Sequence, residues 1–353
     1  MNHELDIREC EDLGCWIGRL PRGCNLCVKG LKSVFFVTGV CNEKCFYCPI
    51  STSRKGKTSA YINEVFVNKV NDIVLEVLAS GSRGVGITGG DPLLAVDYVV
   101  KVMRTLKEVF GRDFHIHMYT TGKNLRTEYL DILSDAGLDE LRIHVTGQHS
   151  WDALKSALNY GFVTGIENPA IPDFSKLRDL VVKGLELGAH FINLNEMEVS
   201  ESNYVGILSR GLKVNPDGLT VRGSREAALQ VMSWVLKEGL AANIHYCPAK
   251  FKDKYQYRRR LIKRFKRTRL PYESINREGV TKWVEVPYED NQLLNYLILS
   301  DLALKKGDIV YSSVKLFKKL RNTISKRQQI RLIEAYPTTP RKLLNIYNIT
   351  NCV

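Results

Sequence analysis

Apolar and polar positions follow two alternating periods from residue 33 onward. Short runs of β-branched and aromatic residues, typical of buried strands, are each followed by a longer stretch with apolar residues every three or four positions, typical of helices. The predicted strands are 33–38, 84–88, 114–120, 140–145, 191–196 and 242–247. The predicted helices are 65–80, 93–110, 126–136, 174–187 and 227–239. Because parallel strands need long crossovers, these units predict an α/β fold with a full or partial (β/α) barrel.

The loops that follow the predicted strands carry the polar motifs. In a (β/α) barrel, functional groups lie on the loops after the carboxyl ends of the strands. A cysteine-rich loop follows the first strand, Gly-Gly-Asp-Pro (89–92) the second, and Thr-Thr-Gly (120–122) the third. The alternation fades after about residue 270, which indicates a smaller appended region. The predicted domains are a Cys-rich metal-binding segment, the barrel and a basic C-terminal region, at 1–32, 33–249 and 250–353.

Composition indicates a soluble globular protein. The 353 residues are 44% apolar and 25% charged, which is ordinary for that class. No apolar run approaches the length of a membrane span, and the first residues are too acidic for a signal peptide. We therefore expect a cytoplasmic chain that makes no membrane contact. In that compartment thiols stay reduced, and clustered cysteines more often bind metals.

Positive charge is concentrated in one segment. The net charge is +13, and residues 250–269 alone hold eleven Lys and Arg against one Asp. The same segment contains Tyr255 and Tyr257. Clustered cations release counterions from a phosphate backbone, and aromatic rings can stack on unpaired bases. The segment predicts a surface for structured RNA such as tRNA or rRNA; the alternative is the solvated face of a lysine-rich thermophile protein.

The loop after the first predicted strand reads VTGVCNEKCFYCPIS (37–51) and holds three cysteines. Cys41, Cys45 and Cys48 have the spacing C-x3-C-x2-C, which lets one loop wrap around a cuboidal iron–sulfur cluster. A structural zinc site needs four ligands, so three local thiolates suit a [4Fe–4S] cluster with one open iron. A zinc site with a distant fourth ligand is the alternative.

These motifs resemble the radical SAM superfamily. Its pattern is C-x3-C-x-aromatic-C, with Tyr47 as the aromatic residue, followed after the second strand by a Gly-Gly-Glu-Pro element similar to TGGDPLL (88–94). The runs RGCNLCVKGLKSVFFVTGVCNEKCFYCPIS and NIHYCPAKFKDKYQYRRRLIKR are similar to an archaeal group related to pyruvate formate-lyase activating enzymes. The resemblance implies a barrel of the radical SAM type with a small basic C-terminal region.

The resemblance also implies the cofactors. Cys41, Cys45 and Cys48 would hold three irons of the cluster, and the amino and carboxylate groups of S-adenosylmethionine would chelate the fourth. An electron, supplied by ferredoxin or flavodoxin, would cleave the cofactor reductively and give a 5′-deoxyadenosyl radical. The protein's part would be to bind, orient and exclude water.

Several further residues are predicted to bind S-adenosylmethionine. Glycines let a backbone approach a ligand closely, so Gly89 and Gly90 would face the methionine amino group. Asp91 stands where the family usually has Glu, which puts its side-chain contact in doubt. Each polar residue at a strand end has an ordinary hydrogen-bonding role as its alternative. The predicted set is Tyr47, Gly89, Gly90, Asp91, Pro92, Thr121, His144 and Asn195.

The other cysteines give a second candidate metal site. Cys10, Cys15, Cys24 and Cys27 precede the first barrel strand and could bind zinc or an auxiliary iron–sulfur cluster. The alternatives are that only the last two matter or that a disulfide forms here. Cys247, at the end of a predicted strand, is a candidate catalytic thiol, although a buried inert cysteine is more common.

The leading interpretation is a radical SAM enzyme that modifies tRNA or rRNA. A radical SAM activase or modifier of a protein or peptide is the alternative, because the narrower resemblance favours it. A zinc-stabilised RNA-binding module without catalysis is the third hypothesis, which the intact three-cysteine motif argues against.

Overall fold

The computed structural model describes residues 14–290, 292–320 and 329–349. The described chain divides into two compact units, one of residues 14–78 and 82–256 and one of residues 79–81 and 257–349. Within these ranges, no helix has both the length and the apolar character needed to cross a bilayer.

The first unit is built on a ten-stranded sheet. Its strand order is β1-β10-β9-β8-β7-β6-β5-β2-β3-β4, and every pair from β10 through β2 is parallel. The two ends of this order do not pair with each other in the described residues, so the sheet is a partial barrel. The strands are β1 (Cys15–Ile17), β2 (Lys32–Phe36), β3 (Ala60–Ile62), β4 (Val65–Val67), β5 (Gly84–Thr88), β6 (His115–Thr120), β7 (Glu140–Ile143), β8 (Val163–Pro169), β9 (Ile192–Asn195) and β10 (Ile244–Cys247).

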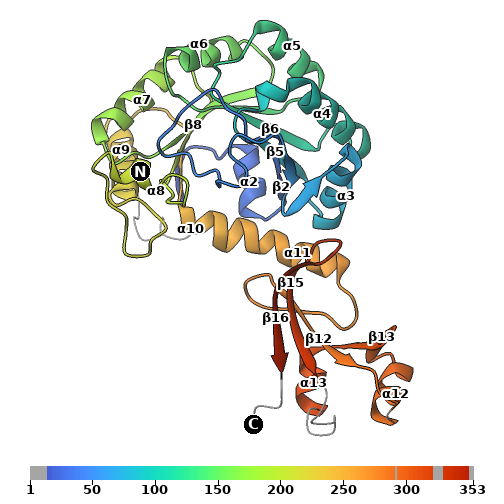
Figure 1. Cartoon of the computed structure of the whole chain (residues 1–353). Helices are drawn as coiled ribbons and strands as arrows, with labels where there is room; N and C mark the ends of the chain where they lie inside the picture. Colours follow the sequence, from blue (N-terminus) through green and yellow to red (C-terminus); the bar gives the residue numbers. More distant parts are fainter. Residues whose placement is uncertain (1–13, 291, 321–328, 350–353) are drawn as a thin grey trace. The chain divides into compact units, whose positions relative to one another are not determined.

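Helices cover the outer face of this sheet (Figure 1). They are the crossovers that parallel strands require. In α4 the apolar side chains of Val99, Met103 and Leu106 recur every three or four residues and are fully buried against the sheet. The helices are α3 (Val70–Ser80), η1 (Pro92–Ala95), α4 (Val96–Phe110), α5 (Thr127–Asp135), α6 (Gln148–Ala157), α7 (Phe174–Glu186), α8 (Tyr204–Leu208) and α9 (Ser224–Lys237).

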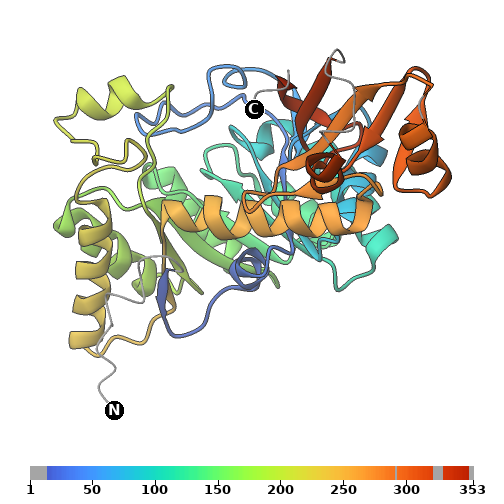
Figure 2. The same ribbon diagram turned by 90° about the horizontal axis from the view of Figure 1, so that it is seen from below.

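One short helix lies inside the curved sheet instead of outside it. Helix α2 (Arg22–Val28) follows β1 through the dark blue loop seen in Figure 2 and occupies the concave side in Figure 1. The Gly23 amide donates to the Glu140 carboxylate at 3.2 Å, so the helix meets β7 at that strand's first residue. The described part of the predicted N-terminal segment is therefore packed into the barrel unit.

The predicted parallel sheet is confirmed, with three differences in detail. Strand β8 (Val163–Pro169) and the hairpin of β3 and β4 were not expected from the sequence. The helix predicted over 65–80 is wrong in its first turn. Val65–Val67 forms β4 there, because its β-branched and aromatic residues pack well in a strand.

In its described residues, the second unit is an antiparallel sheet with three helices. Its order is β13-β14-β12-β15-β16, with β11 on β12. The sequence predicted no fold for this region. It placed the start of the region at residue 250, whereas the main part of the unit starts at Tyr257. Helix α10 (Ala249–Phe251) and the π-helical turn 252–257 lead to this unit. Its elements are α11 (Arg258–Thr268), β11 (Ser274–Ile275), β12 (Thr281–Pro287), α12 (Gln292–Leu299), β13 (Ala303–Lys306), β14 (Ile309–Ser312), α13 (Val314–Leu320), β15 (Ile330–Tyr336) and β16 (Lys342–Ile349).

Candidate active site

The three-cysteine loop leaves the carboxyl end of β2, where the sequence placed it. Cys41, Cys45 and Cys48 are half-buried, free thiols. Burial raises the pKa of Cys41 and of Cys45, and the charge of Cys48 raises both further. All three thiols lie on this one loop, as ligands of one cluster must.

The Gly-Gly-Asp-Pro turn after β5 packs directly on the start of this loop. The Gly90 amide donates to the Thr38 carbonyl at 2.6 Å, and the Asp91 amide donates to the Val40 carbonyl at 2.9 Å. A Cβ atom on Gly90 would lie 2.0 Å from the Val40 oxygen. Only glycine allows this approach, so the second motif fixes the position of the first.

Asp91 has a structural role that the sequence did not reveal. Its carboxylate is fully buried and accepts hydrogen bonds from the Thr120 hydroxyl at 2.9 Å and the Thr121 hydroxyl at 3.1 Å. It also accepts from the Leu93 amide at 3.1 Å and so caps η1, in which Pro92 is the first residue. The predicted cofactor residues Asp91 and Thr121 thus bind each other and join the ends of β5 and β6.

Tyr47 and His144 form a buried pair beside the cysteine loop. The Tyr47 hydroxyl lies 2.9 Å from His144 Nε2, and His144 Nδ1 lies 3.0 Å from the main-chain oxygen of Glu167. Burial lowers the pKa of His144, so its ring is neutral. Because a carbonyl only accepts, the proton sits on Nδ1 and Nε2 accepts from Tyr47. The structure brings these two predicted residues together.

A loop between β9 and α9 supports the cysteine loop from one side. The Asn203 amide donates to the Tyr47 carbonyl at 2.9 Å, and the Ser202 hydroxyl donates to the Cys48 carbonyl at 3.2 Å. The Thr52 hydroxyl donates to the Glu201 carboxylate at 2.7 Å. Sequence reasoning missed this segment because its contacts join residues about 150 positions apart.

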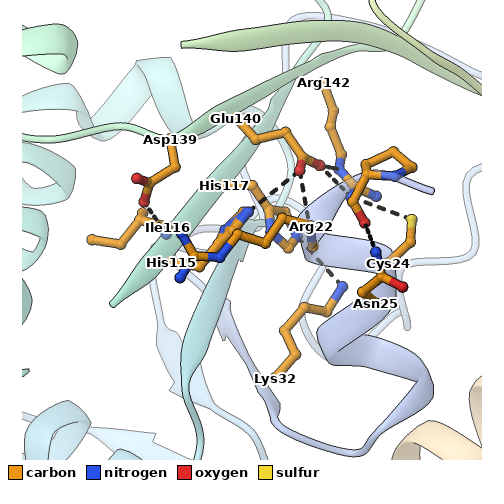
Figure 3. Close-up of polar contacts among 12 residues, drawn as sticks. Arg22, Cys24, Asn25, Lys32, His115, Ile116, His117, Asp139, Glu140 and Arg142 are labelled. Atoms are coloured by element: carbon orange, nitrogen blue, oxygen red, sulfur yellow. Dashed lines mark hydrogen bonds and ion pairs between the residues drawn. The ribbon is translucent and has the colours of Figure 1, made fainter. Parts of the chain in front are cut away.

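A buried ionic network fills the concave side of the sheet (Figure 3). Arg142 donates to Glu140 at 2.6 Å and to Glu167 at 2.5 Å. Asn193 and Asn195 each donate to the Glu167 carboxylate at 2.9 Å, which places the predicted Asn195 in this network. Burial raises the pKa of Glu167, but the Arg142 charge and the two amides outweigh it and lower the pKa to about 2.

Sequence reasoning also missed most of this network, although a signal was present. Polar residues occupy alternate positions of buried strands, as in His115-x-His117 and Glu140-x-Arg142. Alternate positions of a strand face one side of the sheet. In a sheet covered on its outer face by helices, such pairs point to a polar interior.

A cavity of about 250 Å³ lies in this interior. Cys24 and Cys27 reach it from α2, and Cys247 reaches it from the end of β10. Burial raises the pKa of Cys24 to about 11 and also raises that of Cys247, so both thiols are protonated at neutral pH. The lining residues are Cys24, Cys27, Lys32, Val34, Gly86, Thr88, Tyr119, Arg142, Glu167, Asn193, Asn195, His245, Cys247, Phe251, Lys252 and Gln256.

The predicted four-cysteine site is not formed by the described residues. Cys15 lies on β1 beside β10 and is disulfide-bonded, so it offers no thiolate. Cys24 and Cys27 face the cavity with Cys247 instead. Cys10 and Cys352 lie outside the described residues.

The loop thiols fit an iron–sulfur cluster. Among the described residues, no three His, Cys, Asp or Glu side chains converge as a single metal ion requires. A [4Fe–4S] cluster does not need such convergence, because each thiolate binds a different iron. The half-buried loop, held by Gly90 and Asn203, supplies three soft ligands at the carboxyl edge of the sheet.

Comparisons with known proteins agree with this site. A family model described as "Radical SAM superfamily" matches residues 35–167. The "Putative glycyl-radical enzyme activating enzyme" of Methanocaldococcus jannaschii is 40% identical over 274 residues, covering 74% of this chain and 72% of that protein. The "GTP 3',8-cyclase" of Rhodopirellula baltica is 28% identical over 176 residues, covering 49% of this chain and 44% of that protein.

Two solved structures are similar to parts of this chain at low sequence identity. Streptococcus suis SuiB bound to S-adenosylmethionine aligns over 65% of this chain and 56% of its own, with 12% identity and a TM-score of 0.47. Coproporphyrinogen III oxidase from Escherichia coli aligns over 94% of this chain and 76% of its own, with 10% identity and a TM-score of 0.38.

Identity of 40% over nearly three quarters of a relative establishes the family. The family model, at residues 35–167, covers the cysteine loop, the Gly-Gly-Asp-Pro turn and the strands from the end of β2 into β8. Members of this family are enzymes that use a [4Fe–4S] cluster and S-adenosylmethionine, and these are the cofactors of this enzyme. The chain belongs to the radical SAM superfamily, in the archaeal group related to glycyl-radical enzyme activating enzymes.

Proposed function

We propose that this enzyme abstracts a hydrogen atom from a protein or peptide substrate, with a glycine of a partner enzyme as the target. The observation that carries the proposal is the 40% identity to the Methanocaldococcus jannaschii relative over 72% of that protein's length. When bound, the cluster and S-adenosylmethionine supply a 5′-deoxyadenosyl radical as the hydrogen-abstracting group.

The chain's own residues would bind and orient the reactants. Cys41, Cys45 and Cys48 hold the cluster at the carboxyl edge of the sheet, and the turn at Gly90 keeps their loop in place. The cavity on the concave side of the sheet offers a space to a substrate group. Several of its lining residues, among them Cys24, Arg142 and Phe251, are buried, and water exclusion beside them would protect a radical.

Modification of tRNA or rRNA is the second candidate function, favoured by the basic segment 250–269. Lys266 and Arg269 are exposed and could meet phosphates. The aromatic part of the segment is less available, because the Tyr255 ring stacks on Phe251 with centroids 5.8 Å apart. Burial of Arg260 and Arg264 removes two more cations from such a surface, so RNA ranks below a protein substrate.

The auxiliary metal site at Cys24 and Cys27 and the electron donor to the cluster are predictions. Cys24 and Cys27 would hold an auxiliary metal only with ligands beyond the described residues. Ferredoxin or flavodoxin remains the expected electron donor.

The test uses an anaerobic extract of the native host lacking this protein. Reconstituted enzyme, S-adenosylmethionine and a reductant are added, and glycyl radicals are recorded by electron paramagnetic resonance. We expect a doublet signal with the wild-type enzyme and none with the Cys45→Ala variant. An unchanged spectrum together with altered tRNA or rRNA nucleosides would contradict the protein substrate and favour RNA.

A further inference from the structure

The floor of the cavity holds a buried cation that lacks a carboxylate partner. Lys32, the first residue of β2, is only 5% exposed and lines the cavity. Among the described residues its hydrogen-bond partner is His117 Nε2 at 3.4 Å, shown in Figure 3, and no carboxylate lies within ion-pair distance. Burial lowers the pKa of His117, so its ring is neutral and does not compensate the ammonium. A buried charge without a counter-ion is costly.

The other two cations of the cavity are already compensated. Arg142 is paired with Glu140 and Glu167. Lys252 is paired with Glu198. The lining therefore offers one ammonium, that of Lys32, to an anion that enters from outside.

Two further polar atoms at the cavity have no partner in the described residues. Asn193 Oδ1 and His245 Nδ1 are both buried and unsatisfied, and both residues line the cavity. The amide oxygen can only accept a hydrogen bond. An occupant with a hydrogen-bond donor as well as a negative charge would match these atoms and Lys32 together. A phosphodiester has no donor of its own, whereas an acidic residue of a peptide has a carboxylate and an amide N–H.

S-adenosylmethionine itself does not account for this cation. Its carboxylate belongs at the cluster, beyond the carboxyl end of β2, whereas Lys32 starts that strand. Val37, at the start of the cysteine loop, comes five positions after Lys32, a distance of about 16 Å along an extended strand. Lys32 therefore begins deeper in the barrel than the loop that would hold the cluster.

We propose that the cavity binds a carboxylate of the substrate, supplied by an acidic residue or the C-terminus of a peptide, with Lys32 as its counter-ion. The inference rests on the proposed function, in which a peptide enters this barrel. At about 250 Å³ the cavity is smaller than the ~300–1,000 Å³ typical of ligand pockets, so it suits one side chain or a terminal residue. In this arrangement Lys32 positions the substrate and takes no part in bond breaking.

The test measures binding to the reconstituted holoenzyme with S-adenosylmethionine and without reductant, so it does not depend on catalysis. The probe is N-acetylaspartate α-methylamide, which has one carboxylate. N-acetylasparagine α-methylamide is its uncharged counterpart and inorganic phosphate is the competing anion, each titrated by calorimetry. We expect Lys32→Met to weaken binding of the aspartate derivative by about 10- to 100-fold. The exposed Lys155→Met variant is the matched control and should bind like wild type.

A second measurement separates ligand binding from a structural role. Without the probe, Lys32→Met should unfold at the same temperature as wild type or higher, because the variant removes an uncompensated buried charge. A lower unfolding temperature would mean that the protein itself compensates the charge of Lys32, and would overturn the inference. Equal binding of the aspartate and asparagine derivatives, binding of phosphate alone, or displacement of S-adenosylmethionine by the probe would also overturn it. Loss of glycyl-radical formation with intact Lys32-dependent binding would refute the proposed function only.

Discussion

Asp91 is the position where this chain departs from its family, and replacing it tests the structure closely. Its carboxylate accepts from the hydroxyls of Thr120 and Thr121 and from the Leu93 amide, at 2.9–3.1 Å, with no exposed surface. Asp91→Ala would leave these three donors, and the Asn124 amide at 3.5 Å, without their acceptor. Asp91→Glu would restore the usual family residue but add a methylene to a filled site.

The size of each effect follows from these contacts. A hydrogen bond to a charged group contributes about 1.5–3 kcal/mol, and losses within one network are not additive. We expect Asp91→Ala to lower the free energy of unfolding of the barrel unit by about 3–5 kcal/mol. Asp91→Glu should cost about 1–3 kcal/mol through overpacking. Asp91→Asn keeps the volume and one acceptor oxygen, so its cost should lie below that of Ala.

The assay is guanidinium unfolding of each variant, followed by circular dichroism. A double-mutant cycle between Asp91→Asn and Thr120→Val isolates one of the hydrogen bonds, with an expected coupling of about 1–2 kcal/mol. Two results would contradict the hydrogen bonds that join Asp91 after β5 to Thr120 and Thr121 at the end of β6. One is unfolding of both Asp91→Ala and Asp91→Glu at the wild-type midpoint, and the other is a coupling of zero.

Three other substitutions test separate parts of the site. A Cβ on Gly90 would lie 2.0 Å from the Val40 oxygen, so the Gly90→Ala variant should bind much less iron on reconstitution. The control Gly161→Ala, where the Cβ meets open space, should bind iron like wild type. Equal iron content in the two variants would contradict the packing of Gly90 on the cysteine loop. Burial lowers the pKa of His245 from 6.5 to about 4, so the stability it contributes is present above pH 6.5 and lost as the pH falls to 4. The His245→Gln variant should lose about 3 kcal/mol less unfolding free energy than wild type between pH 6.5 and pH 4, measured by guanidinium unfolding at both pH values. An equal loss in the two proteins would refute the assignment. Tyr47→Phe leaves the His144 Nε2 atom without its donor and should lower the free energy of unfolding by about 1–2 kcal/mol, measured by guanidinium unfolding. An unchanged free energy would contradict the hydrogen bond between Tyr47 and His144.

The sequence predicted the parallel sheet and the three-cysteine loop because both are local patterns. A buried strand such as Gly84–Thr88 is a continuous apolar run, and the thiol spacing lies within eight residues. The antiparallel sheet of the second unit was not predicted, because the regular alternation of strands and helices that marks the first unit is absent there.

The sequence could not predict which side chains meet across the barrel. Asp91 and Thr121 were both expected at the cofactor, but neighbouring strand ends bring them to each other. The grouping of Cys24 with Cys247 depends on α2 turning into the concave side of the sheet, a choice that no local pattern encodes. The alternating polar pairs His115/His117 and Glu140/Arg142 were the readable sign of the interior network.

The most direct test of the account is the joint measurement of iron and S-adenosylmethionine cleavage. After anaerobic reconstitution, wild-type enzyme should hold about four irons at the Cys41, Cys45 and Cys48 site and, with a reductant, convert S-adenosylmethionine to equal amounts of methionine and 5′-deoxyadenosine. Cys45→Ala should lose both properties. A wild-type protein that binds only zinc and cleaves nothing, or a Cys45→Ala variant that keeps cluster and cleavage, would contradict the assignment of these three thiols.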